Sequence, residues 1–126
     1  MNMERNYNAL LVDDSRSLRM VVQRLIKSSG YSFNVFWEAN DGREALKIAS
    51  NNEIDIIFTD LNMPVLGGIE FIKEFRKTKK SIPIIVVTTL GSQQIVMDAL
   101  KCGANDYIIK PFSHERIKSV LGKFLK

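Results

Sequence analysis

An almost wholly apolar run that ends in a carboxylate is the strongest constraint on how this chain folds. Residues 54–59 read Ile-Asp-Ile-Ile-Phe-Thr, and Asp60 follows them directly. A strand that is apolar on both faces is typical of a parallel sheet covered on both sides, and ligands bind such sheets outside the carboxyl ends of the strands. Asp60 thus stands where chemistry is usually done. Taken alone, it is also explained as the start of a turn that Pro64 and the glycines at 67–68 complete.

Strand-like and helix-like segments alternate five times along the chain. The strand-like segments are residues 8–12, 33–37, 54–59, 82–88 and 106–109, and the helical patterns after them begin near Ser15, Asp41, Ile69, Ile95 and His114. The residues of the first helix expected to face the core are Leu18, Val21, Val22, Leu25 and Ile26. Asp41 and Glu44 have the spacing of a capping box. This alternation with short connections predicts parallel strands and right-handed crossovers, hence a doubly wound α/β sandwich.

Composition excludes several classes of function. The 126 residues fit one domain, and neither a signal peptide nor an apolar run long enough to cross a bilayer is present, so we expect a cytoplasmic protein that binds no membrane. The net charge of +4 is mild. The densest basic run, 76–80, falls where a helix should end, and cations there interact favourably with the helix dipole. We therefore expect no direct binding of nucleic acid. With Cys102 and His114 as its single cysteine and histidine, the chain lacks a thiolate or imidazole metal cage, so any metal ligands must be oxygens.

Polar residues gather at the expected strand exits. Asp13 and Asp14 follow the first strand, Asp60 the third, and Lys110 the fifth, while Thr88 ends the fourth. Each has a simpler explanation alone, as a helix cap, a β-branched strand residue or a surface turn. Because parallel strands share one carboxyl edge, we expect these residues to converge. Carboxylates that lie so close repel one another and need a proton or a cation, and an all-oxygen cluster suits Mg²⁺.

The same cluster predicts a phosphoryl acceptor. A metal-bound Asp60 would keep one free oxygen as a nucleophile, and carboxylates that attack phosphorus are an established form of covalent catalysis. The oxygens of a transferring phosphoryl group need positive charge and hydrogen-bond donors, which Mg²⁺, the Lys110 ammonium and the Thr88 hydroxyl would supply.

These motifs resemble the receiver domain of bacterial two-component response regulators over essentially the whole chain. The matching elements are residues 12–15 (Val-Asp-Asp-Ser), 60–64 (Asp-Leu-Asn-Met-Pro), 67–68, 87–89 (Val-Thr-Thr), 103–107 and 110–112 (Lys-Pro-Phe). Within the family the chain is most similar to the stand-alone chemotaxis regulator, since it ends after the fifth helix and carries an aromatic residue at Tyr107. The resemblance implies a flavodoxin-like three-layer sandwich of five helices and a five-stranded sheet in the order 2-1-3-4-5, for which that regulator is a standard example. It also implies that residues 1–126 form a single receiver domain with no output domain.

The resemblance implies a role for each site residue. Asp60 would accept a phosphoryl group from the phosphohistidine of a sensor histidine kinase. Asp14 and Asp60 would bind Mg²⁺ directly, the backbone carbonyl of Asn62 would add a ligand, and Asp13 would act through water. Thr88 and Lys110 would bind the phosphoryl oxygens.

Further residues would transmit or tune the signal. Thr88 would move toward the phosphoryl group while Tyr107 turns inward. Thr89 and Leu90 depart from the small and acidic residues found there in relatives, so we expect them, with Asn62, to tune the rate of dephosphorylation. The bond between Lys110 and Pro111 is expected to be cis.

The output implied by the resemblance is a change in the affinity of the face formed by the fourth helix, fifth strand and fifth helix. We expect a chemotaxis-type kinase as donor, the flagellar motor switch protein or a phosphotransfer protein as target, a phosphatase as a further partner, and a monomeric chain. The charged residues of this face are Lys101, Lys110, Arg116, Lys118, Lys123 and Lys126 against Asp98, Asp106 and Glu115. This basic excess favours an acidic or amphipathic target segment.

Other functions remain open at this stage. Within the family, the chain is also explained as a phosphorelay intermediate or as a receiver from a DNA-binding regulator. An aspartate-nucleophile phosphatase would need a second acid where Asn62 stands, and a flavodoxin would meet repulsion between its flavin phosphate and Asp13 and Asp14. We therefore expect no enzyme acting on external substrates, although a receiver catalyses its own phosphorylation and dephosphorylation.

Overall fold

Strands and helices alternate along the whole described chain. The computed structural model describes residues 6–78, 81–89, 93–110 and 112–125. The strands in it are β1 (Asn6–Val12), β2 (Ser32–Ala39), β3 (Ile56–Thr59), β4 (Ile84–Thr88) and β5 (Asp106–Ile109), and the helices are α1 (Arg16–Lys27), α2 (Gly42–Asn51), α3 (Gly68–Arg76), α4 (Gln93–Cys102) and α5 (His114–Phe124). Neighbouring strands pair in parallel in the order β2-β1-β3-β4-β5, which confirms the expected architecture and strand order.

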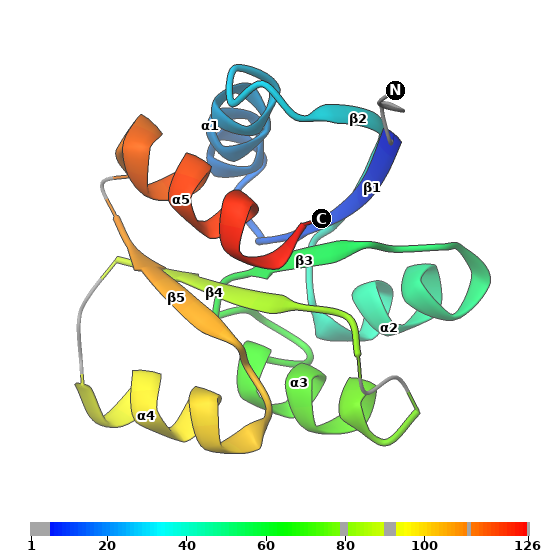
Figure 1. Ribbon diagram of the computed structural model, residues 1–126. Helices are drawn as coiled ribbons and strands as arrows, with labels where there is room; N and C mark the ends of the chain where they lie inside the picture. The colour runs from blue at the N-terminus through cyan, green and yellow to red at the C-terminus, as the bar shows by residue number, and fades with distance from the viewer. Residues whose placement is uncertain (1–5, 79–80, 90–92, 111, 126) are drawn as a thin grey trace.

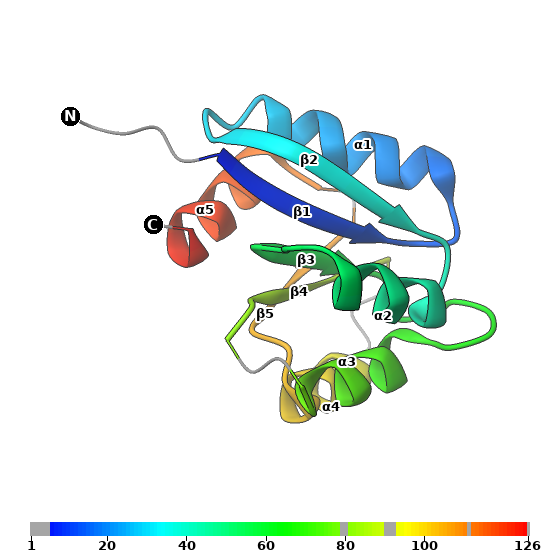
Figure 2. The same cartoon turned by 90° about the vertical axis from the view of Figure 1, so that its right-hand side faces the viewer.

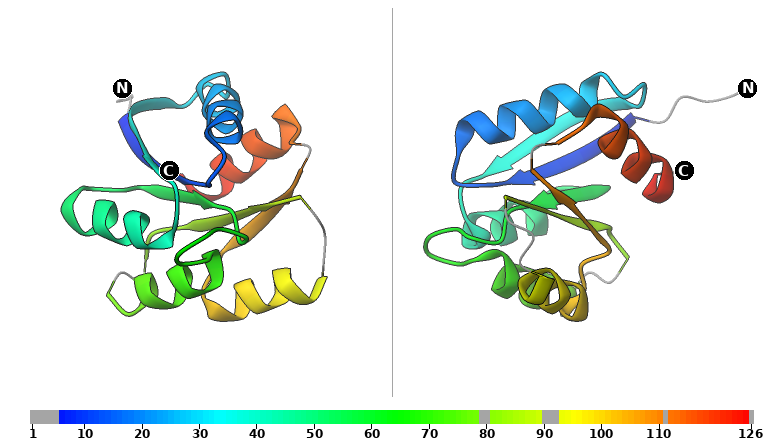
Figure 3. Two further views of the ribbon diagram at one scale, coloured as in Figure 1. Left: turned by 180° about the vertical axis from the view of Figure 1, so that it is seen from behind. Right: turned by 90° about the vertical axis from the view of Figure 1, so that its left-hand side faces the viewer.

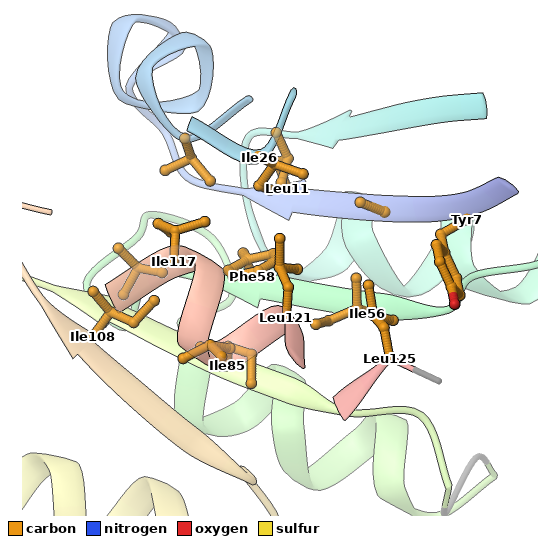
Figure 4. Close-up of a cluster of buried hydrophobic side chains, with 14 residues drawn as sticks. Tyr7, Leu11, Ile26, Ile56, Phe58, Ile85, Ile108, Ile117, Leu121 and Leu125 are labelled. Carbon is orange, nitrogen blue, oxygen red and sulfur yellow. The ribbon is translucent and has the colours of Figure 1, made fainter. Parts of the chain in front are cut away.

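The sheet lies between two layers of helices. Helices α1 and α5 cover one face, and α2, α3 and α4 cover the other (Figures 1 and 2). Along β3, Ile56 and Phe58 belong to the hydrophobic cluster under α1 and α5, shown in Figure 4, whereas Ile57 belongs to the cluster on the opposite face. Full burial of such a side chain contributes about 1.5–3 kcal/mol. Strand β3 is therefore fixed from both sides.

The pairing of β1 with β3 determines where the acidic residues leave the sheet. Val12 lies opposite Thr59 in the ladder, and the Asp60 N–H donates a hydrogen bond to the Val12 carbonyl at 2.8 Å. On the other side of β1, the Asp13 N–H donates to the Ala39 carbonyl of β2 at 3.0 Å. Asp13 and Asp60 thus leave adjacent strands at the same level of the sheet.

Helix α1 begins as expected but buries a different face. Ser15 caps it, since its Oγ accepts from the Leu18 N–H at 3.3 Å. Val21, which we expected to face the core, is 41% exposed, while Arg19 is buried beside Val22 and Ile26. The apolar stripe in the sequence is wider than the strip of helix that contacts the sheet, so its outer edge stays in solvent. Ile95 of α4 is exposed for the same reason, because α4 contributes Val96 and Ala99 to the core instead.

The capping box of α2 is displaced by one residue. Asp41 Oδ1 accepts from the Glu44 N–H at 2.9 Å, as predicted, but Glu44 Oε1 accepts from the Asn40 N–H at 2.7 Å. A capping box would return this bond to the N–H of the cap residue itself. The Glu44 side chain thus fixes Asn40, the residue before the cap.

Arg76 does more than favour the dipole of α3. Its Nε donates to the Gly103 carbonyl at 2.9 Å and its Nη2 to Asn105 Oδ1 at 2.7 Å. The same Asn105 oxygen accepts from the N–H of Ile84 at 2.8 Å. Arg76 therefore links α3 to the connection between α4 and β5 and, through Asn105, to the start of β4.

The connection after Asp60 contains one residue in the left-handed backbone conformation. This residue is Val65 (φ 66°), and neither Gly67 nor Gly68 adopts that conformation. Gly68 is required for a close approach instead: a Cβ there would lie 2.3 Å from the Asp60 carbonyl oxygen and 2.7 Å from Leu61 Cα. The start of α3 therefore packs directly against the backbone of Asp60 and Leu61.

No helix in the described part of the chain is long and apolar enough to cross a membrane.

Replacing Gly68 with alanine should destabilise the protein strongly. Both nearest neighbours of the added Cβ are backbone atoms that cannot rotate away, so we expect a loss of about 2–3 kcal/mol in the free energy of unfolding. Gly67→Ala is the matched control: its Cβ would meet the Leu61 carbonyl oxygen at 3.3 Å, a contact that a small shift relieves, for a loss of at most about 1 kcal/mol. Urea unfolding of the two variants measures the difference, and equal losses would contradict this account of the close approach.

Candidate functional site

The predicted site residues meet at the carboxyl edge of the sheet. Asp13 and Asp14 follow β1, Asp60 follows β3, Thr88 is the last residue of β4, and Lys110 follows β5. The connection from β3 to α3 projects from this edge (Figure 3, right). Because the strands are parallel and their helices return over the faces, this edge is lined by connections alone.

Three aspartates of this edge face one another. One carboxylate oxygen each of Asp13, Asp14 and Asp60 lies within 4.8 Å of the others. The Lys110 ammonium lies 3.4 Å from Asp13 Oδ2, and the two side chains are only 8% and 10% exposed. The convergence of acids with one cation, predicted from the strand exits, is present.

The surroundings of Asp60 raise the pKa of its carboxyl above the usual aspartate value. Burial is the largest cause, and the negative charge of Asp13 acts in the same direction. The Lys110 cation and the backbone N–H groups of Leu61 and Asn62 lower the pKa but do not offset these effects. The Leu61 N–H donates to Asp60 Oδ1 at 2.7 Å. Without a further cation, the site therefore holds a proton on Asp60 more readily than an isolated aspartate would.

The donor atoms fit a hard divalent cation. The described residues that come together as possible ligands here are all carboxylates, one buried, one half-buried and one exposed. Mg²⁺ prefers oxygen ligands and keeps several waters, which suits a cluster with one side open to solvent. Asn62, expected to add its backbone carbonyl, lies on the exposed connection directly after this cluster.

The remaining predicted residues surround this cluster. Thr88 is buried, and its carbonyl accepts from the Lys110 N–H at 2.7 Å. Thr89 is exposed and, with Lys110, lines a groove of about 480 Å³ beside α1. The ring of Tyr107 lies at the surface. Leu90 and Pro111 lie outside the described residues. The Lys110–Pro111 bond, which we expected to be cis, is therefore outside them as well.

Arg19 is a residue of this region that the sequence prediction missed. Its guanidinium donates to the backbone carbonyl of Asp13, to Glu38 Oε1 at 2.8 Å and to Asn40 Oδ1 at 3.0 Å. The signal was present in the sequence, because Arg19 precedes Val22 by three positions and so lies on the same helical face. A charged residue on a core-facing position predicts a buried partner.

The face of α4, β5 and α5 is less basic than its composition indicates. Arg116 Nη2 lies 3.1 Å from Asp106 Oδ1, and Lys123 Nζ lies 3.3 Å from Asp106 Oδ2. Burial raises the pKa of Asp106, but the Tyr107 N–H and these two cations together hold it below the usual value. Two of the cations expected to attract an acidic target are thus paired within the chain, and Lys126 lies outside the described residues.

This face also exposes apolar side chains. Large hydrophobic side chains stand at its surface on α4 and β5: Ile95, Met97, Tyr107 and Ile109. A groove of about 470 Å³ lies between the two elements, and its walls are Gln93, Val96, Met97, Leu100, Tyr107 and Ile109. A surface of this kind marks an interaction site more often than isolated exposed side chains do.

Comparison with known proteins gives one consistent result. The response regulator receiver domain family matches residues 9–122. The chemotaxis protein CheY of Thermotoga maritima is 39% identical over 117 residues, which are 93% of this chain and 96% of that protein. CheY-3 of Vibrio cholerae is 32% identical over 126 residues, covering 98% of this chain and 95% of that protein.

Solved structures agree with the sequence comparison. The chemotaxis response regulator CheY4 of Vibrio cholerae superposes with a TM-score of 0.84 at 36% identity, covering 96% of this chain and 100% of that one. A response regulator of Chloroflexus aurantiacus superposes with a TM-score of 0.87 at 26% identity, covering 96% and 98%. With the acidic cluster at the edge of the same sheet, these matches show that the chain belongs to the response regulator receiver domain family, is similar to chemotaxis CheY proteins, and functions in phosphorylation-activated signalling.

Proposed function

We propose that this protein is a switch which accepts a phosphoryl group from a sensor histidine kinase onto Asp60 in a Mg²⁺-dependent reaction. The observation that supports this most directly is the meeting of three carboxylate oxygens within 4.8 Å of one another, with Lys110 beside them. Asp60 is the member that follows the central strand and carries the raised pKa. In this proposal Asp60 is the acceptor, and Asp13 and Asp14 are the supporting acids.

The residues of the site have separate roles in phosphoryl transfer. Asp14, Asp60 and the Asn62 carbonyl would hold Mg²⁺, with Asp13 acting through water, and the bound ion would supply positive charge that offsets the carboxylates and the phosphoryl oxygens. Asp60 Oδ1 is held by the Leu61 N–H, and the carboxylate attacks phosphorus as the bond to the donor imidazole breaks. The leaving imidazole takes a proton from solvent.

Lys110 and Thr88 then bind the transferred group. The Lys110 ammonium is held 3.4 Å from Asp13 Oδ2 before the reaction, and its charge acts on Asp60, so it is available to a phosphoryl oxygen there. The Thr88 hydroxyl donates to another of these oxygens, and Tyr107 turns inward as Thr88 moves. Thr89, Leu90 and Asn62 set the rate at which water removes the phosphoryl group.

The apolar groove between α4 and β5 is the output surface in this proposal. An amphipathic segment fits it better than a purely acidic one, because Arg116 and Lys123 are paired with Asp106. We infer that the target is the flagellar motor switch protein, since the relatives are chemotaxis proteins. A histidine phosphotransfer protein is the second candidate, and a phosphatase is a further partner.

The remaining features follow from the same proposal. The chain acts as a monomeric, cytoplasmic receiver and binds neither nucleic acid nor membrane. It is no enzyme for external substrates, because Asn62 stands where an aspartate-nucleophile phosphatase needs its general acid. It catalyses only its own phosphorylation and dephosphorylation.

Incubation with a small-molecule phosphodonor should add one phosphoryl group to the wild type. We expect the adduct only with Mg²⁺ present, and none on Asp60→Asn, because the amide is not a nucleophile. Intact mass spectrometry detects the adduct, and its cleavage by neutral hydroxylamine distinguishes an acyl phosphate from a phosphoserine. Asp55→Asn, which changes an aspartate of the same strand region but not of the cluster, is the matched control. An adduct on Asp60→Asn would show that the acceptor is another residue.

Without Mg²⁺, Asp60→Asn should be more stable than the wild type at neutral pH. The folded state raises the pKa of Asp60, so this group favours folding while protonated, and that contribution is lost as pH rises through the raised pKa. The amide of the Asp60→Asn variant does not ionise, so the variant does not lose stability in this way as the pH rises. The difference in melting temperature should therefore widen as the pH rises above the usual aspartate pKa of about 4. Mg²⁺ should then raise the melting temperature of the wild type more than that of the variant; a difference independent of pH and Mg²⁺ would contradict the assignment.

Removing an apolar wall of the groove should weaken target binding. For the phosphorylated protein and the motor switch protein of the same organism, we expect Met97→Ser or Ile109→Ser to lower affinity by about tenfold or more. Met20→Ser, which changes an exposed apolar residue of α1, should leave affinity unchanged. Since two basic residues are already paired, added salt should have a small effect. Affinity that falls steeply with salt and ignores Met97 would favour an acidic target.

A further inference from the structure

The buried side chain of Arg19 joins three separate segments of the chain. It is 8% exposed and extends from α1 to the end of β2, where its Nε lies 2.8 Å from Glu38 Oε1. Its Nη1 donates both to Asn40 Oδ1 at 3.0 Å, on the connection to α2, and to the backbone carbonyl of Asp13. A guanidinium presents its donors in a rigid planar fork, so these contacts fix the three segments in one geometry.

The contact with Asp13 also fixes the direction of Asp14. The carbonyl of Asp13 and the N–H of Asp14 belong to one planar peptide unit. At its other end, Asp13 donates its own N–H to Ala39, and its Oδ1 accepts from the Ser15 N–H at 2.9 Å. With Asp13 held at both ends, the rotation of the following peptide decides where the Asp14 backbone lies and from which point its side chain starts. Arg19 is the side chain that holds this rotation.

We propose that Arg19 is a positioning residue for the Mg²⁺ site. By holding the Asp13 carbonyl it directs the Asp14 carboxylate toward those of Asp13 and Asp60, and Glu38 in turn holds Arg19. The inference rests on the proposed function, because it takes Asp14 as a Mg²⁺ ligand.

Electrostatic repulsion alone would have the opposite effect. A guanidinium near a cation site repels the cation, so removing it would tighten Mg²⁺ binding if charge were all that mattered. Loss of a residue that orients metal ligands instead weakens metal affinity by about 10–100-fold. The direction of the change in affinity therefore separates positioning from charge.

Calorimetric titration of the full chain with Mg²⁺, in the absence of phosphodonor, measures this directly. We expect Arg19→Met and Arg19→Lys each to raise the Mg²⁺ dissociation constant by about tenfold or more, because lysine keeps the charge but cannot make the forked contacts. Arg16→Met is the charge-matched control: it removes an exposed cation from the first turn of the same helix and should leave the dissociation constant within about twofold. Thermal melting confirms that each variant is folded.

Two substitutions at Glu38 test the positioning role while Arg19 itself is kept. They remain informative if the Arg19 variants do not fold. Glu38→Ala removes the partner of Arg19 Nε and should weaken Mg²⁺ binding by at least about threefold, while Glu38→Gln keeps an acceptor and should restore it. Unchanged binding in Glu38→Ala, or tighter binding in Arg19→Met, would overturn the positioning role while leaving the proposed function intact. No binding by the wild type would overturn both.

Discussion

The parallel pairing of β1 with β3 is the constraint on which the site depends. It places the exits of the two strands side by side, so that Asp13 and Asp60 meet as neighbouring carboxylates. Both strands bury side chains on both faces of the sheet, and moving them apart would disrupt both hydrophobic clusters. The repulsion between the acids therefore cannot be relieved by a shift of the backbone and must be offset by nearby groups.

The fold offsets this repulsion only in part. Lys110 pairs with Asp13, and backbone N–H groups after β3 stabilise the charge on Asp60. The pKa of Asp60 nevertheless stays raised, which means that its ionised form is still the less favoured one. A site in this condition is stabilised by any event that adds positive charge or removes the charge of Asp60. Such a gain is what a two-state switch needs, because a ligand shifts an equilibrium only by its differential affinity for the two states.

Sequence patterns were sufficient for the alternation of strands and helices and for the members of the acidic cluster, whereas the strand order came from the resemblance to receiver domains. Apolar runs, caps and chain order determine which residues leave which strand, and parallel pairing then brings Asp13, Asp60 and Lys110 together. Contacts across segments were not predictable in the same way. The salt bridges of Asp106 depend on how α5 lies over β5, and the role of Gly68 depends on the approach of α3 to the Asp60 backbone. Neither contact can be read from a local pattern, because the residues that it joins are not separated by the repeat of a helix or a strand.

Strand β5 connects the acidic cluster to the apolar groove. Ile109 lies opposite Thr88 in the ladder, and Lys110 follows it with its N–H on the Thr88 carbonyl. The start of the strand is fixed, because Asp106 is held by Arg116 and Lys123 of α5. Between these ends the side chains alternate, with Ile108 buried and Tyr107 and Ile109 exposed at the groove. In the proposed switch, a rearrangement of Thr88 and Lys110 would therefore act on the end of β5 where Ile109 forms a wall of the groove, and not on the end that α5 holds.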